Sequence, residues 1–286
     1  MKIIDGRKIK EEILTEIKKE ITSLQFIPVF CDVLVGDDPS SVQYVKMKAK
    51  TAEFLGIKFY NASFPSNIKT EDLIKEIKIL NKIPNMCGII VQLPLPETLD
   101  RRAILDAIDS NLDVDCLGTD TSEKFYGGLT SVCSPAAMAC IKLLDSLNLN
   151  LKDKKIIVLG QGELVGKPVT ALLKFRELSP IIITSENNYK KELVKQGDIV
   201  ISGIGKGKYI TGDMIKEGAV LIDAGTSESN GSIVGDIDFE SVKNIAGFIS
   251  PVPGGVGPVT VAMLFNNVLK VAKRVPVIPV SLTYGK

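Results

Sequence analysis

The segment from Ser41 to Lys48 carries three side chains whose types and spacing could support acid–base chemistry. On a helix, Ser41, Tyr44 and Lys48 lie three and four residues apart, so a hydroxyl, a phenol and an amine share one face. The chain has 286 residues and no histidine, although histidine is the usual proton carrier near neutral pH. Any acid–base step must therefore use a carboxylate, a tyrosine, a cysteine or a lysine.

A lysine acts as a base near neutral pH only if its pKa falls from about 10.4 by roughly 3 units, which is about 4 kcal/mol. Burial of Lys48 against the Tyr44 ring, with few counter-charges nearby, would favour the neutral amine. Gln92 follows an apolar strand pattern, and open α/β sheets bind ligands at the carboxyl ends of their strands. Asp115 lies in the segment between the two halves of the chain. We expect Lys48, Gln92, Tyr44 and Asp115 to form a catalytic set.

Composition and charge exclude several classes of protein. The 35 basic and 34 acidic residues give a net charge of +1, which provides no reason to expect nucleic acid or an anionic membrane as partner. No apolar run approaches the ~20 residues of a bilayer span, and the first residues lack the apolar core of a signal peptide. The five cysteines form no CxxC pair, so we expect reduced thiols, no metal site and a cytoplasmic location.

Helix and strand patterns alternate along both halves of the chain. Isoleucines recur at every fourth position from Ile9 to Ile21 and predict a helix. This alternation is typical of an α/β fold with mostly parallel sheets covered by helices. Further helices are expected at about 40–55, capped by Ser40 or Ser41, and at 71–81, from Ser134–Pro135 onward and at 258–273; strands are expected at 29–35, 57–60, 88–92, 155–159, 181–184, 199–202 and 219–223. Residues 111–134 are expected to be irregular, and the 275–286 tail to be an extended or poorly ordered end.

A glycine-rich turn joins the predicted strand at 155–159 to a helix. Gly160 and Gly162 would let the backbone approach a pyrophosphate, and the helix that opens near Gly166 would supply amide hydrogens. The spacing GxGxxxG leaves NAD, NADP or another nucleotide open, as well as a tight turn without a ligand. Gln161 and Glu186 favour NAD, because an acidic group at the end of the second strand can bond the ribose 2′-hydroxyl. The alternative is that Glu186 is a solvated loop carboxylate without a ligand.

A second unusual loop runs from Ser250 to Thr260 and opens the last long helix. Its prolines stiffen the backbone, and its glycines allow a ligand to approach closely. Such a loop is either a rigid helix entry or a ligand-facing segment, and its density of glycine and proline favours the second.

Taken together, several motifs resemble one family. Over nearly the whole chain, from Asp5 to about Ala272, the sequence is similar to the bifunctional methylenetetrahydrofolate dehydrogenase/methenyltetrahydrofolate cyclohydrolases. The strings that carry the resemblance are Val35–Ser41 with Tyr44, Val45 and Lys48; Gly88–Pro96; Asp113–Asp115; Gly235–Phe239; and Pro251–Pro258.

The resemblance implies an activity and a fold. A hydride would pass from 5,10-methylenetetrahydrofolate to NADP or NAD, and water would open the methenyl product to 10-formyltetrahydrofolate. An N-terminal three-layer α/β domain at 1–133, with a helix at about 262–286 packing back, would bind folate. A Rossmann-like domain at 134–261 would bind the nucleotide, and two copies of the chain would form a homodimer.

The resemblance also implies roles for single residues. Lys48 would handle the proton of the water-addition step, and Gln92 would orient it. The substrate-binding residues would be Ser41, Tyr44, Asp115, Pro253, Gly254 and Gly255. The cofactor-binding residues would be Gly160, Gln161, Gly162, Gly166, Ser185, Glu186 and Thr226.

The chain departs from the family pattern mainly around the cofactor. Gly160-Gln161-Gly162 stands where the family usually has Gly-Arg-Ser, whose arginine helps to hold the NADP 2′-phosphate, whereas Ser185 keeps a position that contacts this phosphate in relatives. The folate-side residues match the pattern. Two alternatives therefore stand beside the bifunctional enzyme: a cyclohydrolase alone, with a degraded nucleotide site, and a non-enzymatic nucleotide-binding module.

Overall fold

The computed structural model describes residues 1–184, 191–229 and 231–274. The chain divides into two compact units. The six-stranded unit consists of Met1–Thr15 and Asp115–Phe265, and the three-stranded unit consists of Glu16–Val114 and the described residues from Asn266 onward. Two long helices, α1 (Gly6–Thr22) and α10 (Val256–Ala272), each contribute residues to both units.

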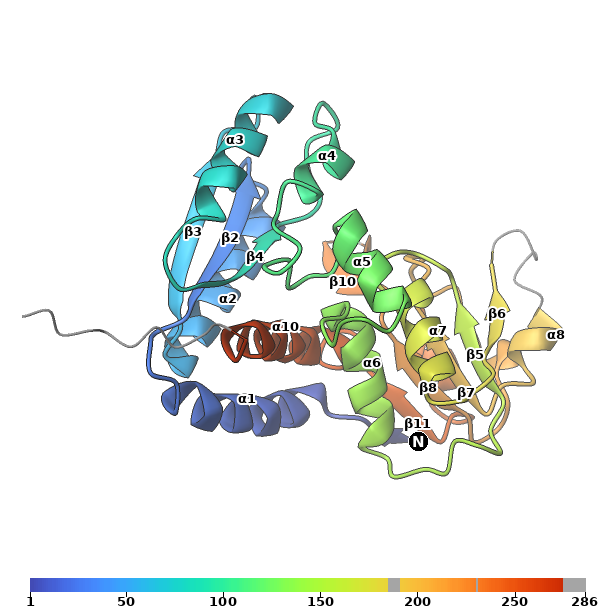
Figure 1. Ribbon diagram of the computed structural model, residues 1–286. Coiled ribbons are helices and arrows are strands. Elements are labelled where there is room, and N and C mark those ends of the chain that lie inside the picture. The colour runs from blue at the N-terminus through green and yellow to red at the C-terminus, as the bar shows by residue number, and fades with distance from the viewer. Residues whose placement is uncertain (185–190, 230, 275–286) are drawn as a thin grey trace, which may run out of the picture. The chain divides into compact units, whose positions relative to one another are not determined.

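The six-stranded unit is built on a parallel sheet with the strand order β1-β11-β8-β7-β5-β6 (Figure 1). Its strands are β1 (Lys2–Ile3), β5 (Ile156–Leu159), β6 (Ile181–Ile183), β7 (Ile199–Ser202), β8 (Val220–Asp223) and β11 (Phe248–Ser250). The strand β5 lies between β6 and β7, so the order of the strands reverses there. Ligands of open α/β sheets bind outside the carboxyl ends of the strands at such a switch point.

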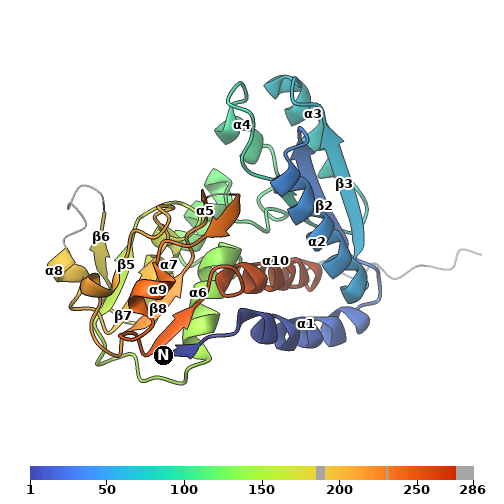
Figure 2. The same cartoon turned by 180° about the vertical axis from the view of Figure 1, so that it is seen from behind.

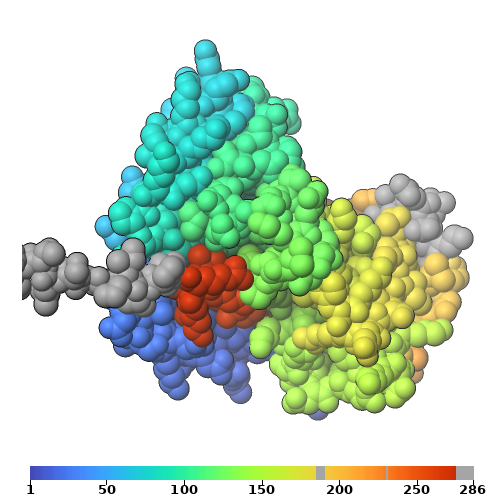
Figure 3. Space-filling model, viewed as in Figure 1, coloured from blue at the N-terminus to red at the C-terminus, as the bar shows by residue number. Residues whose placement is uncertain are grey.

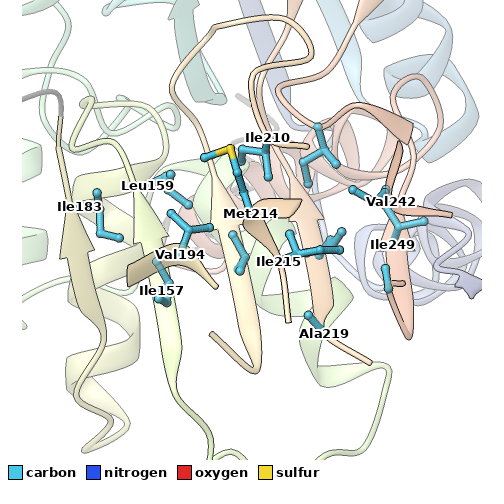
Figure 4. Close-up of a cluster of buried hydrophobic side chains, with 14 residues drawn as sticks. Ile157, Leu159, Ile183, Val194, Ile210, Met214, Ile215, Ala219, Val242 and Ile249 are labelled. Atoms are coloured by element: carbon cyan, nitrogen blue, oxygen red, sulfur yellow. The ribbon is translucent and has the colours of Figure 1, made fainter. Parts of the chain in front are cut away.

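Helices cover both faces of this sheet. The helices α6 (Pro135–Asp145) and α7 (Gly166–Phe175) pack together on one face, and α8 (Lys191–Val194), the 3₁₀ turn η2 (Gly212–Met214) and α9 (Phe239–Val242) lie over the other (Figures 1 and 2). Figure 4 shows the apolar layer beneath the second set, where Ile157, Leu159 and Ile249 project from the strands. The unit also contains α5 (Thr119–Tyr126) and the antiparallel pair β9 (Ser227–Ser229) and β10 (Ser232–Val234).

The three-stranded unit is a parallel sheet with the order β3-β2-β4. Its elements are β2 (Val29–Val35), α2 (Pro39–Leu55), β3 (Lys58–Phe64), α3 (Thr70–Leu80), β4 (Met86–Val91) and α4 (Arg101–Leu105). The helix α2 packs on β2 and β3, and α3 packs on α4. In the space-filling view, the segments containing α3 and α4, coloured cyan to green, form one surface of this unit (Figure 3).

The sequence placed most of these elements to within two or three residues, with some exceptions. The N-cap of α2 is Asp38, whose carboxylate accepts the N–H of Ser41 at 2.8 Å, and not Ser40 or Ser41 as expected. Pro39 already occupies the first turn, so the helix begins before either serine. The segment 111–134 is not wholly irregular, because α5 lies within it, and β1 and β11 were not foreseen. The 275–286 tail lies outside the described residues.

The compact units cut the chain at places other than 133. The first fifteen residues join the six-stranded unit, because β1 pairs in parallel with β11 through Lys2↔Phe248 and Ile3↔Ile249. The end of α10 belongs to the three-stranded unit, where Asn267 donates to the carbonyl of Val114 at 2.9 Å. The boundaries of the functional domains at 1–133 and 134–261 stay a prediction. Among the helices of the described chain, none has the length and apolar character of a membrane span.

Candidate active site

A buried lysine lies between an amide and a carboxylate in the three-stranded unit. The ammonium of Lys48 donates to Oε1 of Gln92 at 2.7 Å, and its Nζ lies 2.7 Å from Oδ2 of Asp32. Lys48 is 5% exposed and Asp32 is 0% exposed. The amide nitrogen of Gln92 donates in turn to the carbonyl of Leu93 at 2.8 Å, which fixes the carboxamide with its oxygen toward the lysine. The sequence thus predicted the pairing of Lys48 with Gln92 but not the carboxylate.

Three neighbouring elements position this group. Asp32 lies in the middle of the central strand β2, in register with Asn61 of β3 and Ile90 of β4. Gln92 directly follows β4, and its N–H bonds the carbonyl of Val33 at 2.8 Å, so the ladder extends to the residue that carries the amide. Lys48 is on α2, which begins with the Asp38 cap and ends at Gly56 in the left-handed conformation, with φ of 77°. Both ends of the helix are thereby fixed.

The expectation of few counter-charges around Lys48 is wrong. A carboxylate at contact distance favours the charged ammonium and opposes the neutral amine. Burial raises the pKa of the Asp32 carboxyl, while the charge of Lys48 and its hydrogen bond act against that rise. One sequence signal could have revealed this residue: Asp32 is the single charged side chain in the otherwise apolar strand Val29–Val35.

The other folate-side residues are placed as follows. Ser41 is 4% exposed, at the start of the same helix as Lys48. Tyr44 is 37% exposed, and the polar partners of the Lys48 amine are Gln92 and Asp32; packing of the amine against the tyrosine ring stays a prediction. Asp115 is half-buried and is the first residue of the second stretch of the six-stranded unit. Lys48, Gln92 and Tyr44 are therefore together in one unit, and Asp115 belongs to the other.

The glycine turn of the six-stranded unit has the geometry of a close-approach site. Gly160 has φ of +88°, a conformation that favours glycine. A Cβ atom on Gly166 would lie 2.0 Å from the carbonyl oxygen of Gly160, so the first turn of α7 needs a glycine to sit against the loop. A Cβ atom on Gly162 would meet nothing within 4 Å. The backbone at Gly162 thus faces open space at the carboxyl end of β5, which fits a bound pyrophosphate.

The remaining cofactor-side residues divide into two groups. The amide of Gln161 donates to the carbonyl of Gly160 at 2.7 Å and to the hydroxyl of Thr170 at 3.1 Å, so this side chain braces the turn against α7. Thr226 is exposed shortly after β8. Ser185 and Glu186 lie outside the described residues. The preference for NAD over NADP that was inferred from Glu186 therefore stays a prediction.

Two buried aspartates that the sequence did not single out hold the loops after β7 and β8. Asp236 accepts the hydroxyl of Ser202 at 2.7 Å and the N–H groups of Ile204 and Lys206, each at 2.8 Å. Asp223 accepts three backbone N–H groups, from Gly225, Asp236 and Ile237. Burial raises the pKa of Asp223 to about 7, and the N–H of Ile237 acts against that rise. The network fixes the backbone at Gly225, directly before Thr226.

The expected substrate loop follows β11. Gly254 has φ of +112°, and the N–H of Gly255 bonds the carbonyl of Pro251 at 2.7 Å, which closes a tight turn. The peptide before Pro253 is cis. The N–H of Gly6 bonds the carbonyl of Gly254 at 3.0 Å. The loop is thus held by the start of α1 and lies, like the glycine turn, at the carboxyl end of a strand in the parallel sheet.

Comparison with known families matches this arrangement of two units. Residues 4–115 match the catalytic domain of tetrahydrofolate dehydrogenase/cyclohydrolase, and residues 133–275 match the NAD(P)-binding domain of the same enzymes. The chain belongs to the tetrahydrofolate dehydrogenase/cyclohydrolase family. The catalytic match contains Asp32, Lys48 and Gln92, and the NAD(P)-binding match contains the glycine turn.

Individual members of the family are similar to this chain over nearly its full length. A bifunctional protein FolD of Nitratiruptor sp. is 40% identical over 278 residues, which cover 96% of this chain and 99% of that protein. The crystal structure of the bifunctional enzyme FolD from Campylobacter jejuni is 34% identical, with a TM-score of 0.90 and coverage of 96% and 99%. The Trypanosoma brucei enzyme, solved with NADP and an inhibitor, is 33% identical, with a TM-score of 0.89 and coverage of 95% and 97%. These relatives do not favour the cyclohydrolase-only or the non-enzymatic alternative.

Proposed function

We propose that the protein oxidises 5,10-methylenetetrahydrofolate to the methenyl compound with NADP or NAD, and then hydrolyses that compound to 10-formyltetrahydrofolate. It thereby acts in one-carbon metabolism. The observation that carries the proposal is the buried hydrogen bond of 2.7 Å between Lys48 and Gln92 in a chain of this family. An amine held by a fixed carboxamide can take up and release a proton in a chain that has no histidine.

In the hydrolysis step, Lys48 would act on the attacking water. The methenyl bridge carries a positive charge, so its carbon accepts an oxygen lone pair directly. Water adds to this carbon while Lys48, in its amine form, accepts one proton. The ring C–N bond then breaks as the added hydroxyl loses its proton and its oxygen forms the formyl C=O. The freed nitrogen gains one proton, so the net product is the formyl compound on the other nitrogen and the one proton that Lys48 accepted. Gln92 would orient the amine, while Ser41, Tyr44 and Asp115 would hold the folate.

In the oxidation step, the protein has mainly to position the reactants. The bound nicotinamide supplies the acceptor for the hydride. We propose that Gly160, Gly162 and Gly166 hold the pyrophosphate against the start of α7, with Gln161 bracing the turn. Thr226, Ser185 and Glu186 complete the predicted cofactor set, and Pro253, Gly254 and Gly255 the predicted substrate loop. Buried Asp223 and Asp236 support the cofactor side by fixing its loops.

An absorbance assay tests both activities. With methylenetetrahydrofolate and either NADP or NAD, the purified protein is expected to form the methenyl chromophore, and this chromophore is expected to decay faster than it does without enzyme. Titration of the two cofactors gives their preference; a 100-fold difference in affinity corresponds to about 2.7 kcal/mol. Failure to form the methenyl compound with both cofactors would contradict the dehydrogenase part, and failure to hydrolyse it would contradict the other.

We further propose that the protein is a cytoplasmic homodimer. The free thiols of Cys31, Cys87 and Cys140 are buried, as is usual in a reducing compartment. Within the described part of the chain, β3 hydrogen-bonds on one side only, and Tyr60 on this strand is 43% exposed. An edge strand of this kind is available for pairing with a second copy. Sedimentation equilibrium is expected to give twice the mass of one chain, and Tyr60→Lys is expected to shift it toward the monomer; a monomeric wild type would reject the dimer.

A further inference from the structure

Resting on the proposed hydrolysis, we propose that Asp32 is a positioning residue for that step. Its carboxylate holds Lys48 at the Gln92 carboxamide and stabilises the charged amine, so that hydrolysis requires a higher pH than it would without the carboxylate. Asp32 acts through Lys48 and does not touch the substrate.

The placement of Asp32 leaves Lys48 as its charge partner. The carboxylate is 0% exposed in the middle of the central strand. Among the described residues, neither of its oxygens accepts a hydrogen bond from backbone N–H or from a neutral side chain. A buried carboxylate is costly unless it is paired, and the Nζ atom of Lys48 lies 2.7 Å away. The lysine therefore compensates the carboxylate, and the carboxylate fixes the lysine.

The two hydrogen-bond acceptors of Lys48 determine the direction of the lone pair on its neutral amine. An ammonium has three N–H groups. One is directed at Oε1 of Gln92, and a second faces Oδ2 of Asp32. When Lys48 loses a proton, the two hydrogens facing acceptors stay, and the lone pair takes the third position. Asp32 and Gln92 together thus aim this lone pair at a single direction, where the water that it deprotonates must lie.

Among the residues that the structure describes, Asp32 is also the charged group at contact distance from the Lys48 amine. Burial raises the pKa of the Cys31 thiol to about 12, with the charge of Asp32 adding to the rise, and burial raises the pKa of Cys87 to about 11, so both thiols stay neutral. The other titratable groups on the elements packed around the pair are Lys46, Lys50 and Glu53 on α2, Lys58 and Tyr60 on β3, and Asp113 beside β4. Those on α2 and β3 are exposed, and solvent screens their charges.

Burial raises the pKa of Asp32, and the charge of Lys48 and its hydrogen bond oppose that rise. Removal of the negative charge takes away the interaction that favours the ammonium. The neutral amine then becomes available at lower pH, although its direction is less well fixed.

The test is the pH dependence of hydrolysis in Asp32→Asn. We subtract the uncatalysed rate and plot kcat against pH. In this plot, the rise of kcat with pH is expected to shift by about 1–3 pH units toward lower pH. KM for the methenyl compound is expected to stay within about twofold, because Asp32 does not touch it. The matched control is Asp72→Asn, which removes the exposed carboxylate of an ion pair with Lys75 in the same unit; its pH dependence of kcat is expected to coincide with that of the wild type.

A second variant separates charge from shape. Asp32→Val also removes the charge, with a side chain suited to a strand, and is expected to show the same shift; it is decisive if Asp32→Asn does not fold. If folded variants show the same pH dependence of kcat as an active wild type, the proposed role of Asp32 is overturned. Absence of hydrolysis in the wild type would instead contradict the proposed function itself, so the two failures are distinguishable.

Discussion

Lys48→Met is expected to lower the rate of methenyl hydrolysis by about 10²–10⁴-fold, because the group that accepts the proton of water is lost. Oxidation of the methylene compound is expected to persist in the folded fraction, since hydride transfer depends on positioning and not on an acid. The absorbance assay follows both steps with one protein sample. Lys46→Met, on the exposed side of the same helix, is the control and is expected to behave as the wild type.

Lys48→Met is also expected to destabilise the protein. Without the lysine, Asp32 becomes a buried charge with no counter-charge, and breaking a buried pair in this way costs about 3–5 kcal/mol. Replacing both partners removes the uncompensated charge, so Lys48→Met combined with Asp32→Val is expected to recover most of the loss while hydrolysis stays absent. Denaturant unfolding measures both effects. A single variant as stable as the wild type would contradict the pairing of these two residues.

Gly166→Ala is expected to abolish binding of NADP and NAD, with a loss of at least about 100-fold, or about 2.7 kcal/mol. The added Cβ atom would lie 2.0 Å from the backbone oxygen of Gly160, so the turn and the helix cannot keep their contact. Because this clash involves backbone, we also expect lower thermal stability. Hydrolysis, whose proposed proton-handling residues Lys48 and Gln92 belong to the other unit, is expected to survive in the fraction that remains folded.

Gly162→Ala is the matched variant. A Cβ atom there meets nothing within 4 Å, so the fold is expected to accept it without loss of stability. If the pyrophosphate lies against this backbone, the methyl group occupies its place, and cofactor affinity falls although stability does not. Fluorescence titration of the reduced cofactor and thermal unfolding measure the two effects. Wild-type affinity in Gly166→Ala would show that the turn does not hold the nucleotide.

The sequence predicted what depends on local pattern. The glycine turn, the strand before it and the glycine end of α2 follow from residue types at fixed offsets, and Lys48 with Gln92 follows from a helix face and a strand end. The N-cap of α2 was placed two or three residues too late, because Asp38 was not recognised as the capping side chain. Long-range pairs have no such signature. The contact between Asp32 and Lys48 joins a buried position in the middle of β2 to a buried position on α2. The hydrogen bond between the N–H of Asp236 and the carboxylate of Asp223 joins loops thirteen residues apart in sequence.

The short strands β1 and β11 were not predicted for a related reason. The strands β1 and β11 have two and three residues, too few to show a periodicity. The strand β1 is recognisable only by its pairing with β11, and β11 by its pairing with β1 and β8. The charge in β2 was visible but was not interpreted, because a single aspartate in an apolar run has no local meaning until its partner is known. Exposure of Tyr44 likewise depends on packing that no spacing reveals.

The pairing of β1 with β11 has a consequence for how the chain is made. The strand β1 is synthesised long before its partner β11 and can pair with it only after residue 250 has been made. Contacts of such sequence separation slow folding, since a long loop must close before they form. Until then, the backbone N–H and C=O groups with which β1 and β11 pair lack their hydrogen-bond partners in the sheet. A nascent chain of this protein therefore completes its larger sheet only after β11 has been synthesised, however early its smaller sheet is formed.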